Sequence, residues 1–209
     1  MEAPILLNLE KVPFLPKQVP AHDSIHWNSV IKHQAKLKND RAILTTYAHM
    51  EALGILPNST TLPLIFKACA NLQTLERGKK IQNDMMGSPL INDIRVGTSL
   101  VDFYSKCGCL EDAYYVFDEM PKRDVIAWNA MILGCVQCME YEAALFLFME
   151  MQEENLRPNS RTVVSLLKAC GELSELGLGK GIHGYCLRNG LMEMSSHVGK
   201  ALISFYSIF

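Results

Sequence analysis

Cysteine and histidine are the residue types in this chain whose spacing could support chemistry. Cys135 and Cys138 form a Cys-x-x-Cys pair, and His49 and Glu51 form a His-x-Glu pair. Zinc deaminases hold zinc with a His and two Cys while a Glu moves protons, but a proline directly precedes their Cys pair. Gly134 occupies that place here. Both pairs also fall inside expected helices of different repeats, so we predict no catalytic residue, no metal site and no cofactor.

A second cysteine pair, Cys107 and Cys109, flanks Gly108 at the expected end of a helix. Glycine favours a turn at such a place, so we interpret the pair as turn residues rather than metal ligands. The seven cysteines are an odd number and lie mostly among apolar neighbours. That pattern favours reduced thiols in a protein core over a secreted disulfide framework.

The composition of the 209 residues favours a folded protein. Hydrophobic residues make up 49% and charged residues 20%, which excludes a disordered or collagen-like chain. The net charge is −2, so nucleic-acid binding would depend on how the charges are distributed rather than on their total. The longest apolar run, 125–139, is shorter than the ~20 residues that span a bilayer. We therefore expect no membrane segment.

Residues 1–23 differ from the rest of the chain. They contain three prolines after Pro4 and the acidic residues Glu2 and Glu10. Transit peptides are rich in Arg and Ser and poor in acidic residues, and signal peptides need a charged start and an uninterrupted apolar stretch. The segment matches neither pattern, and we expect an irregular N-terminal arm.

The strongest signal in the sequence is an internal repeat. The two tryptophans, Trp27 and Trp128, lie 101 residues apart in the segments HWNSVI and AWNAMI. Residues 24–93 and 125–194 share 20 identities over 70 positions without a gap. Chance would give about four or five identities at average residue frequencies. The chain therefore contains a structural unit that occurs more than once.

Each unit divides into pairs of expected helices. The first period contains stretches of 35, 35 and 31 residues, and apolar residues with helical spacing mark two helices in each. In the third stretch these helices are 95–107 and 110–120, with Gly108 between them. No stretch alternates with period two for long enough to predict a sheet. Such pairs bury their apolar faces by stacking, so we predict an all-α superhelical solenoid of helix-turn-helix repeats, with the two tryptophans, Ala42 and Ala143 in its core.

The repeats also resemble a known family. The segments WNAMI, LLKAC, GKGIH, VGTSLVDFYSKCG and VFDEMPKRD occur in this 35-, 35- and 31-residue order. Over 24–209 they resemble the PLS class of plant pentatricopeptide repeat proteins, whereas tetratricopeptide repeats use one unit length throughout. The resemblance implies a right-handed superhelix. The motifs it implies are P 24–58, L 59–93, S 94–124, P 125–159, L 160–195 and a truncated S 196–209.

In that family the fifth and last residues of a motif select one RNA base. The resemblance assigns this role to three pairs: Asn28 with Asn58, Thr98 with Asp124, and Asn129 with Asn159. Asn offers a donor and an acceptor and tolerates either pyrimidine, whereas Thr with an acceptor-only Asp suits guanine. The implied target is pyrimidine, unassigned, guanine, pyrimidine, unassigned, from 5′ to 3′. The L motifs have Pro63 and Val164 at the fifth position, without a polar side chain, so we expect weak selection or spacing there.

Two further sets of positions follow from the resemblance. The second residue of a motif flanks the base plane in the family, which assigns base stacking to Ile25, Arg95 and Ile126. A basic residue near the end of the first helix faces phosphate. Lys36 and Lys106 match that position, whereas Gln137 departs from it.

Charge supports a groove independently of the family. The expected first helices, 24–36, 60–70, 95–106, 126–137 and 161–171, hold seven basic residues and one acidic residue, Asp102, a balance of +6. The rest of the chain holds 13 basic and 21 acidic residues. A chain with net negative charge is thus expected to have one basic side.

These expectations combine into a sequence-selective binder of single-stranded RNA, without a catalytic site or a small-molecule substrate. The family implies RNA processing or C-to-U editing in mitochondria or chloroplasts. Editing-complex proteins are then further partners, with any deaminase acting in trans. A second class stays open: a protein–protein scaffold whose concave groove holds a peptide. RNA filter binding and a peptide pull-down separate these two, and zinc analysis tests the enzyme alternative.

Overall fold

Helices alternate with short turns along the whole described chain. A computed structural model describes residues 24–209, and the arm expected at 1–23 lies outside the described residues. The first helices of the five full motifs are α1 (Ser24–Lys36), α3 (Leu62–Asn71), α5 (Ile94–Lys106), α7 (Val125–Gln137) and α9 (Ser160–Glu172). The second helices are α2 (Asp40–Ala52), α4 (Leu75–Asp84), α6 (Leu110–Glu119), α8 (Tyr141–Glu153) and α10 (Leu176–Arg188). The sixth motif contributes α12 (Ser196–Tyr206).

Two motifs contain a short helix that the sequence did not predict. The 3₁₀ helix η2 (Pro89–Asn92) follows α4, and the short helix α11 (Leu191–Met194) follows α10. Both precede the first helix of the next motif, so two helices per motif is incomplete for 59–93 and 160–195. No helix within the described range has the length and apolar character needed to span a membrane.

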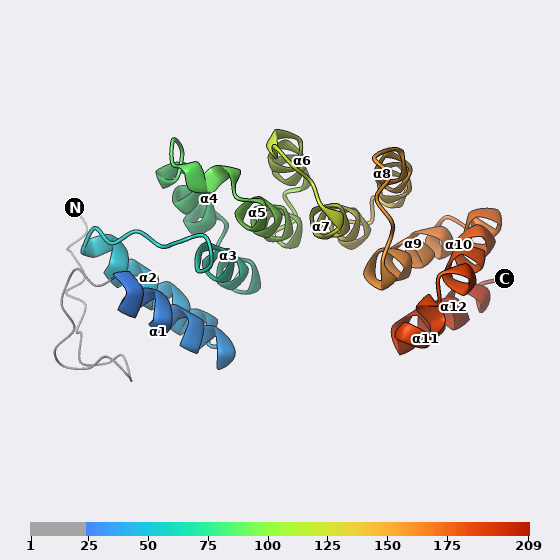
Figure 1. The fold of residues 1–209 in the computed structure, drawn as a ribbon, viewed down its shortest axis with the longest axis horizontal. Helices are drawn as coiled ribbons and strands as arrows, with labels where there is room; N and C mark the ends of the chain where they lie inside the picture. Colours follow the sequence, from blue (N-terminus) through green and yellow to red (C-terminus); the bar gives the residue numbers. More distant parts are fainter. Residues whose placement is uncertain (1–23) are drawn as a thin grey trace.

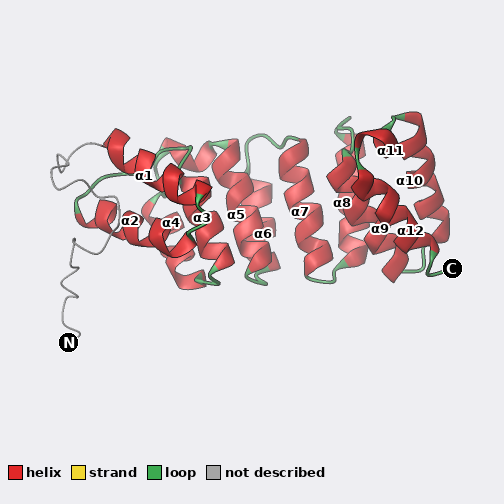
Figure 2. Ribbon diagram, turned by 90° about the horizontal axis from the view of Figure 1, so that it is seen from below, coloured by secondary structure: helices red, strands yellow, loops and turns green. Residues whose placement is uncertain are grey.

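The helices form two layers along an arc. In Figure 1, α3, α5, α7 and α9 follow the inner side of the arc, and α4, α6 and α8 follow the outer side. Figure 2 shows the helices one after another along the long axis of the molecule. Each inner helix packs on the next, from α3 to α5, α7, α9 and finally α12. No strand occurs between residues 24 and 209, and the all-α solenoid is confirmed.

The two repeated tryptophans lie in the core between the layers. Trp27 and Trp128 are 3% and 1% exposed, which confirms their predicted place. Trp128 packs edge-on against Phe117 with ring centroids 4.9 Å apart, and its Nε1–H donates to Glu154 Oε2 at 3.2 Å. Trp27 packs against the buried ring of His49, with centroids 6.3 Å apart. Aromatic rings in such contacts anchor each motif in the stack.

The alanine pair predicted for the core is only half-buried. Ala42 and Ala143 lie at the flank of α2 and α8, whereas the next residue in each helix, Ile43 or Ala144, is buried. Successive helical residues are rotated by about 100° around the axis, so the two neighbours face different surroundings. Sequence identity between repeats therefore marked the right helix turn but not the innermost residue.

The first helix of each of the five full motifs is followed, two residues after its end, by a residue in the left-handed backbone region. Gly108, predicted as a helix break, has φ +74°. The same position in the other four motifs has φ between +53° and +65° without a glycine, at Lys38, Gln73, Met139 and Ser174. This conformation costs a non-glycine residue about 1–2 kcal/mol, so the tight helix pair imposes it against local preference.

Two repeated glycines permit close packing on the next inner helix. Gly78 in α4 lies against the ring of Phe103, and Gly179 in α10 lies against the ring of Phe205. An added Cβ at either position would collide with the aromatic ring. The identity of these glycines between the two periods thus reflects a steric requirement at two equivalent contacts.

Candidate nucleic-acid interface

The inner layer carries a net positive charge. With the helix bounds of the structure, the five full first helices hold seven basic residues and two acidic residues, Asp102 and Glu172, a balance of +5. The predicted balance of +6 is wrong by one because α9 continues to Glu172. The prediction of a basic inner layer is retained, since the charge sign and its distribution are unchanged.

The first predicted base-selecting pair is in direct contact. Asn28, in the second turn of α1, is 5% exposed. Its Nδ2 donates to the Ser24 carbonyl at 2.6 Å, and its Oδ1 accepts the Asn58 backbone N–H at 3.4 Å. The same Oδ1 accepts the hydroxyl of Thr61 at 2.5 Å. Asn58 enters from the loop before α3, so packing of α3 on α1 brings the pair together.

The third pair repeats this arrangement one period later. Asn129 Oδ1 accepts the hydroxyl of Thr162, the third residue of the following motif. Asn159 donates its backbone N–H to the same Thr162 hydroxyl oxygen at 3.1 Å. Sequence reasoning missed both threonines. The signal was available, because Thr61 and Thr162 are identical in the aligned repeats.

The second pair lacks such a link. Thr98 is half-buried in α5, and its hydroxyl makes no hydrogen bond to any residue between 24 and 209. Asp124 Oδ1 accepts the backbone N–H groups of Ile126 and Ala127, each at 2.9 Å. Ala127 stands where the other two junctions have threonine, and it offers no hydroxyl. Asp124 Oδ2 has no donor among the described residues, so it is available to accept a hydrogen bond.

The last residues of the motifs also have a structural role that sequence reasoning missed. Asp93, Asp124 and Asn159 are the N-caps of α5, α7 and α9: Asp93 accepts one backbone N–H of the helix that follows, and Asp124 and Asn159 accept two each. Asp and Asn are preferred at this position because their side-chain oxygens satisfy the free N–H groups of the first turn. An acidic or amide residue directly before a helix was the signal that could have revealed this role.

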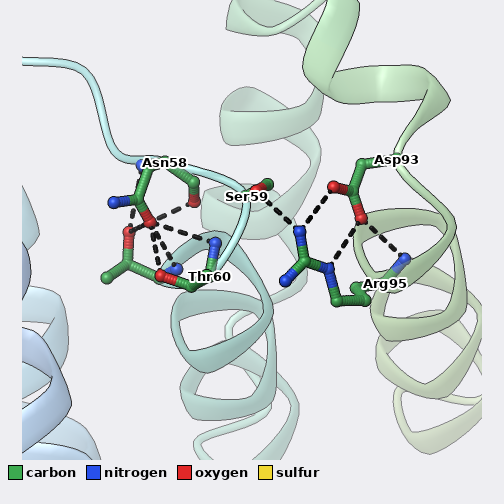
Figure 3. Close-up of polar contacts among 6 residues, drawn as sticks. Asn58, Ser59, Thr60, Asp93 and Arg95 are labelled. Atoms are coloured by element: carbon green, nitrogen blue, oxygen red, sulfur yellow. Dashed lines mark hydrogen bonds and ion pairs between the residues drawn. The ribbon is translucent and has the colours of Figure 1, made fainter.

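The predicted stacking residues lie at the surface in the first turn of their helices. Ile25 and Ile126 are 79% and 63% exposed, which is high for isoleucine. Arg95 is held edge-on, as Figure 3 shows: its Nε donates to Asp93 Oδ1 at 3.2 Å, and its Nη2 donates to Asp93 Oδ2 and Ser59 Oγ, both at 2.9 Å. These bonds occupy the guanidinium edge and leave its planar face for a base.

The Arg95–Asp93 pair also affects the motif 59–93. The hydrogen bonds from Arg95 hold the pKa of the Asp93 carboxyl below its usual range. Both Asp93 oxygens are engaged, and the fifth residue of the motif is Pro63 in the first turn of α3. Val164, the fifth residue of 160–195, packs half-buried against the core. Weak selection at these two motifs stays a prediction.

The two predicted phosphate-contacting lysines differ in their surroundings. Lys36 is exposed at the end of α1, whereas Lys106 Nζ pairs with Asp102 Oδ2 at 2.7 Å. An open groove of about 590 Å³ runs along the ends of α3, α5 and α7, where Asn71, Lys106 and Gln137 occupy equivalent positions. Lys106 is thus the one lysine in the wall of this groove, and its charge is partly offset by Asp102.

The cysteines flagged in the sequence lie in ordinary packing contacts. Cys135 Sγ contacts the hydroxyl of Tyr114 at 3.2 Å, and Cys138 Sγ donates to the Ser105 carbonyl at 3.6 Å. Burial raises the pKa of both thiols, which disfavours the thiolate that binds metal. His49 is buried on α2. Across residues 24–209, no three His, Cys, Asp or Glu side chains converge as a potential metal site.

Comparison with known proteins identifies the repeats. A model described as the PPR repeat family matches residues 123–172, and one described as PPR repeat matches 98–125. A pentatricopeptide repeat-containing protein of Arabidopsis thaliana is 41% identical over 172 residues, covering 82% of this chain and 26% of its own length. Another from the same plant, named as mitochondrial, is 34% identical over 186 residues, covering 88% of this chain and 27% of its own length. The chain therefore spans about a quarter of the length of these relatives.

Solved structures share the fold. The pentatricopeptide repeat protein PPR10 in complex with an 18-nucleotide psaJ RNA element superposes with a TM-score of 0.72 at 19% identity, over 88% of this chain and 27% of that one. Nuclear proteinaceous RNase P 2 of A. thaliana superposes with a TM-score of 0.62 at 15% identity, over 79% of this chain and 38% of that one. At these identities the likeness establishes the fold alone. With matched repeats, a two-layer helical solenoid and relatives that align along most of its length, the chain belongs to the pentatricopeptide repeat family.

Proposed function

We propose that this chain binds single-stranded RNA along its inner layer and that three of its motifs each select one base. The observation that carries the proposal is the recurrence of one arrangement at the start of α1, α5 and α7. In each, a polar fifth residue lies beside the exposed second residue of the same helix: Asn28 by Ile25, Thr98 by Arg95, and Asn129 by Ile126. A polar group beside a stacking surface is what recognition of an unpaired base requires.

The hydrogen-bonding groups that remain unused support the proposed bases. The side-chain oxygens of Asn28 and Asn129 are engaged by the protein, and one Asn28 Nδ2–H donates to the Ser24 carbonyl. Both Nδ2–H groups of Asn129 and the second one of Asn28 are therefore left for a base. Pyrimidines present carbonyl oxygens that accept such donors. Thr98 and the open Oδ2 of Asp124 offer a hydroxyl and an acceptor, which suits the N–H groups of guanine. The proposed target is pyrimidine, unassigned, guanine, pyrimidine, unassigned.

The charge of the inner layer supports binding to a phosphate backbone. Its balance of +5 contrasts with the net charge of −2 of the whole chain. Lys36 and Lys106 are the proposed phosphate contacts, as basic residues at the ends of α1 and α5. Basic residues that displace counterions from single strands make affinity fall with salt.

The cellular role that we propose for this chain is based on its relatives. We propose that its motifs follow the PLS order and that it directs RNA processing or C-to-U editing in mitochondria or chloroplasts. Relatives named as mitochondrial or as chloroplastic/mitochondrial support that location. In this proposal the chain has no catalytic residues of its own. A deaminase or other editing-complex protein would act in trans on the RNA that the chain holds.

Selection of bound RNAs from a random pool tests the proposal. We expect enrichment of pyrimidine, any base, guanine, pyrimidine in consecutive positions, with retention that falls as salt rises. A pool that yields no consensus, with retention indifferent to salt, would overturn RNA recognition. A peptide pull-down in parallel measures the scaffold alternative on the same preparation.

A further inference from the structure

We infer that Thr61 and Thr162 are positioning residues for base selection. Each hydroxyl lies between the two selecting residues of the preceding motif and determines which end of the asparagine amide faces the RNA. The inference deepens the proposed function and rests on it. It adds the third residue of the following motif to the fifth and last residues that define a selecting pair.

The hydrogen-bond pattern determines the direction of each hydroxyl. Thr162 Oγ1 accepts the backbone N–H of Asn159 at 3.1 Å, so that lone pair is occupied. A hydroxyl carries one hydrogen, and its nearest acceptor is Asn129 Oδ1, whereas Asn159 Oδ1 lies farther away at 3.4 Å. The amide of Asn129 is thereby held with its oxygen toward the protein and its Nδ2 on the other side.

Thr61 in the first period forms the same pattern of hydrogen bonds. Thr61 Oγ1 accepts the Asn58 backbone N–H at 3.1 Å. Its nearest acceptor is Asn28 Oδ1 at 2.5 Å, whereas the carbonyl and side-chain oxygens of Asn58 are both at 3.2 Å. One threonine thus connects the side chain of the fifth residue to the backbone of the last residue in both periods.

Burial separates this role from direct contact with RNA. Thr61 and Thr162 are 0% and 1% exposed, so neither hydroxyl can reach a nucleotide. A rotated amide would place Nδ2–H groups against the hydroxyl hydrogen. That hydrogen would have to turn to a more distant acceptor, an Asn58 oxygen at 3.2 Å or Asn159 Oδ1 at 3.4 Å, and the bond to the amide would be lost. The threonine therefore acts through asparagine, by disfavouring the amide orientation that would present oxygen to the base.

The junction between motifs 94–124 and 125–159 has a hydroxyl as its fifth residue and no buried threonine. Thr98 is the fifth residue there, and Ala127 takes the place of the buried threonine. A hydroxyl rotates freely and can donate or accept, so it does not need an external group to orient it. Threonine at this buried position occurs where the selecting residue is an amide, and alanine occurs where it is a hydroxyl.

The test is base discrimination at the nucleotide that faces motif 125–159. Thr162→Val removes the hydroxyl and keeps the side-chain shape, whereas Thr162→Ser keeps the hydroxyl. Dissociation constants would be measured for RNAs with each of the four bases at that nucleotide. We expect Val to lower the pyrimidine-over-purine ratio by about fivefold, as the loss of one hydrogen bond of average strength does, and Ser to retain it. The guanine preference set by Thr98 and Asp124 stays unchanged in both variants.

Each other outcome has a defined meaning. An unchanged ratio in Thr162→Val overturns the positioning role. A ratio that falls equally at the guanine nucleotide shows a general structural effect and also overturns it. A wild-type chain without any base preference overturns the proposed function itself, which separates that failure from failure of the positioning role. Thr61→Val, scored at the nucleotide facing 24–58, replaces Thr162→Val if that variant does not fold. Its expected change is smaller, because the Ser24 carbonyl and the Asn58 backbone N–H also hold the Asn28 amide.

A measurement without RNA provides an independent readout. The side-chain NH₂ signals of Asn129 and the backbone N–H signal of Asn159 report on the two bonds of Thr162. In nuclear magnetic resonance spectra of the full chain, Thr162→Val should shift both signals and leave those of Asn28 and Asn58 in place. Unshifted Asn129 signals in a folded variant would contradict the inference.

Discussion

The junctions that follow motifs 24–58 and 125–159 differ from the junction that follows 94–124 at one buried position. After 24–58 and 125–159, a threonine hydroxyl holds the amide of Asn28 or Asn129, whereas Ala127 takes its place after 94–124. At the junction after 94–124, the Thr98 hydroxyl and one Asp124 oxygen make no hydrogen bond to residues 24–209. A planar amide needs external orientation and a hydroxyl does not, so the hydrogen bonds around each proposed selecting residue match its chemistry.

The proposed phosphate-contacting lysines also differ between motifs 24–58 and 94–124, in the opposite sense. Lys36 forms no ion pair with the described part of the chain, whereas Lys106 is paired with Asp102. The motif 94–124 thus has open base-selecting groups and a partly neutralised lysine. Motif 24–58 has restrained base-selecting groups and an open lysine. Under the proposed function, base selection and attraction of the RNA backbone would therefore be adjusted separately in each motif.

The largest expected effect tests the core on which the Asn-bearing junctions rest. Trp128→Ala should lower the free energy of unfolding by ~3–5 kcal/mol, because it empties a buried aromatic site. Urea unfolding followed by circular dichroism measures the change. A loss below ~1 kcal/mol would show that Trp128 does not anchor its motif and would break the equivalence of the two periods.

Two substitutions would give the junction after 94–124 the residues of the other two junctions and test whether the buried threonine matters. Thr98→Asn should move the preference at the facing nucleotide from guanine to uracil by the family's code, changing discrimination by about 1–3 kcal/mol. Adding Ala127→Thr should strengthen that new preference, since it supplies the hydroxyl that orients the amide. Filter binding with four RNAs measures both variants. The pyrimidines facing Asn28 and Asn129 serve as controls, and a uniform loss of affinity would refute modular selection.

The turn after the first helix provides a comparison that does not involve RNA. Motif 94–124 has Gly108 in the left-handed turn, and motif 125–159 has Met139 there with φ +65° and a 72% exposed side chain. Met139→Gly should stabilise the chain by about 1 kcal/mol, because glycine adopts this conformation without the steric cost. Gln73→Gly is the matched control with a smaller gain, because Gln73 Nε2 donates to the carbonyls of Ala70 and Lys106. Thermal unfolding compares the two, and a destabilised Met139→Gly would contradict the account.

The smallest expected effect concerns the lysine pair. Asp102→Asn frees Lys106 and should raise affinity for all RNA sequences by at most ~1 kcal/mol at low salt. Lys36→Ala should lower affinity for all sequences by a similar amount. Titrations at two salt concentrations measure both changes. An effect of Asp102→Asn that depends on the RNA base would place Asp102 in base selection instead.

Much of the fold could be predicted because the repeat fixes it twice. The observed first helices begin and end within two residues of the expected ones, since apolar periodicity and a shared turn position mark them in every motif. Gly108 was recognised as a break because glycine favours a turn. Lys38 and Met139 adopt the same conformation but were not recognised, since their residue types do not favour it.

The hydrogen bonds of the candidate site could not be predicted from the sequence, and the roles of its residues stay a prediction. The fifth and last positions followed from the resemblance, and the structure brings Asn28 and Asn58 together. The role of Thr61 depends on how α3 packs on α1, which no local pattern reports. The pair between Asp102 and Lys106 could have been found, because residues four apart lie on one side of a helix.

The guanine preference at the nucleotide facing Thr98 and Asp124 tests modular base selection most directly. The measurement is the dissociation constant of the unmodified chain for four RNAs that differ only at that nucleotide. If each motif selects its own base, the guanine RNA binds tightest, with a margin of about 1–3 kcal/mol from exchanged base-edge contacts. Equal affinity for all four RNAs would contradict it.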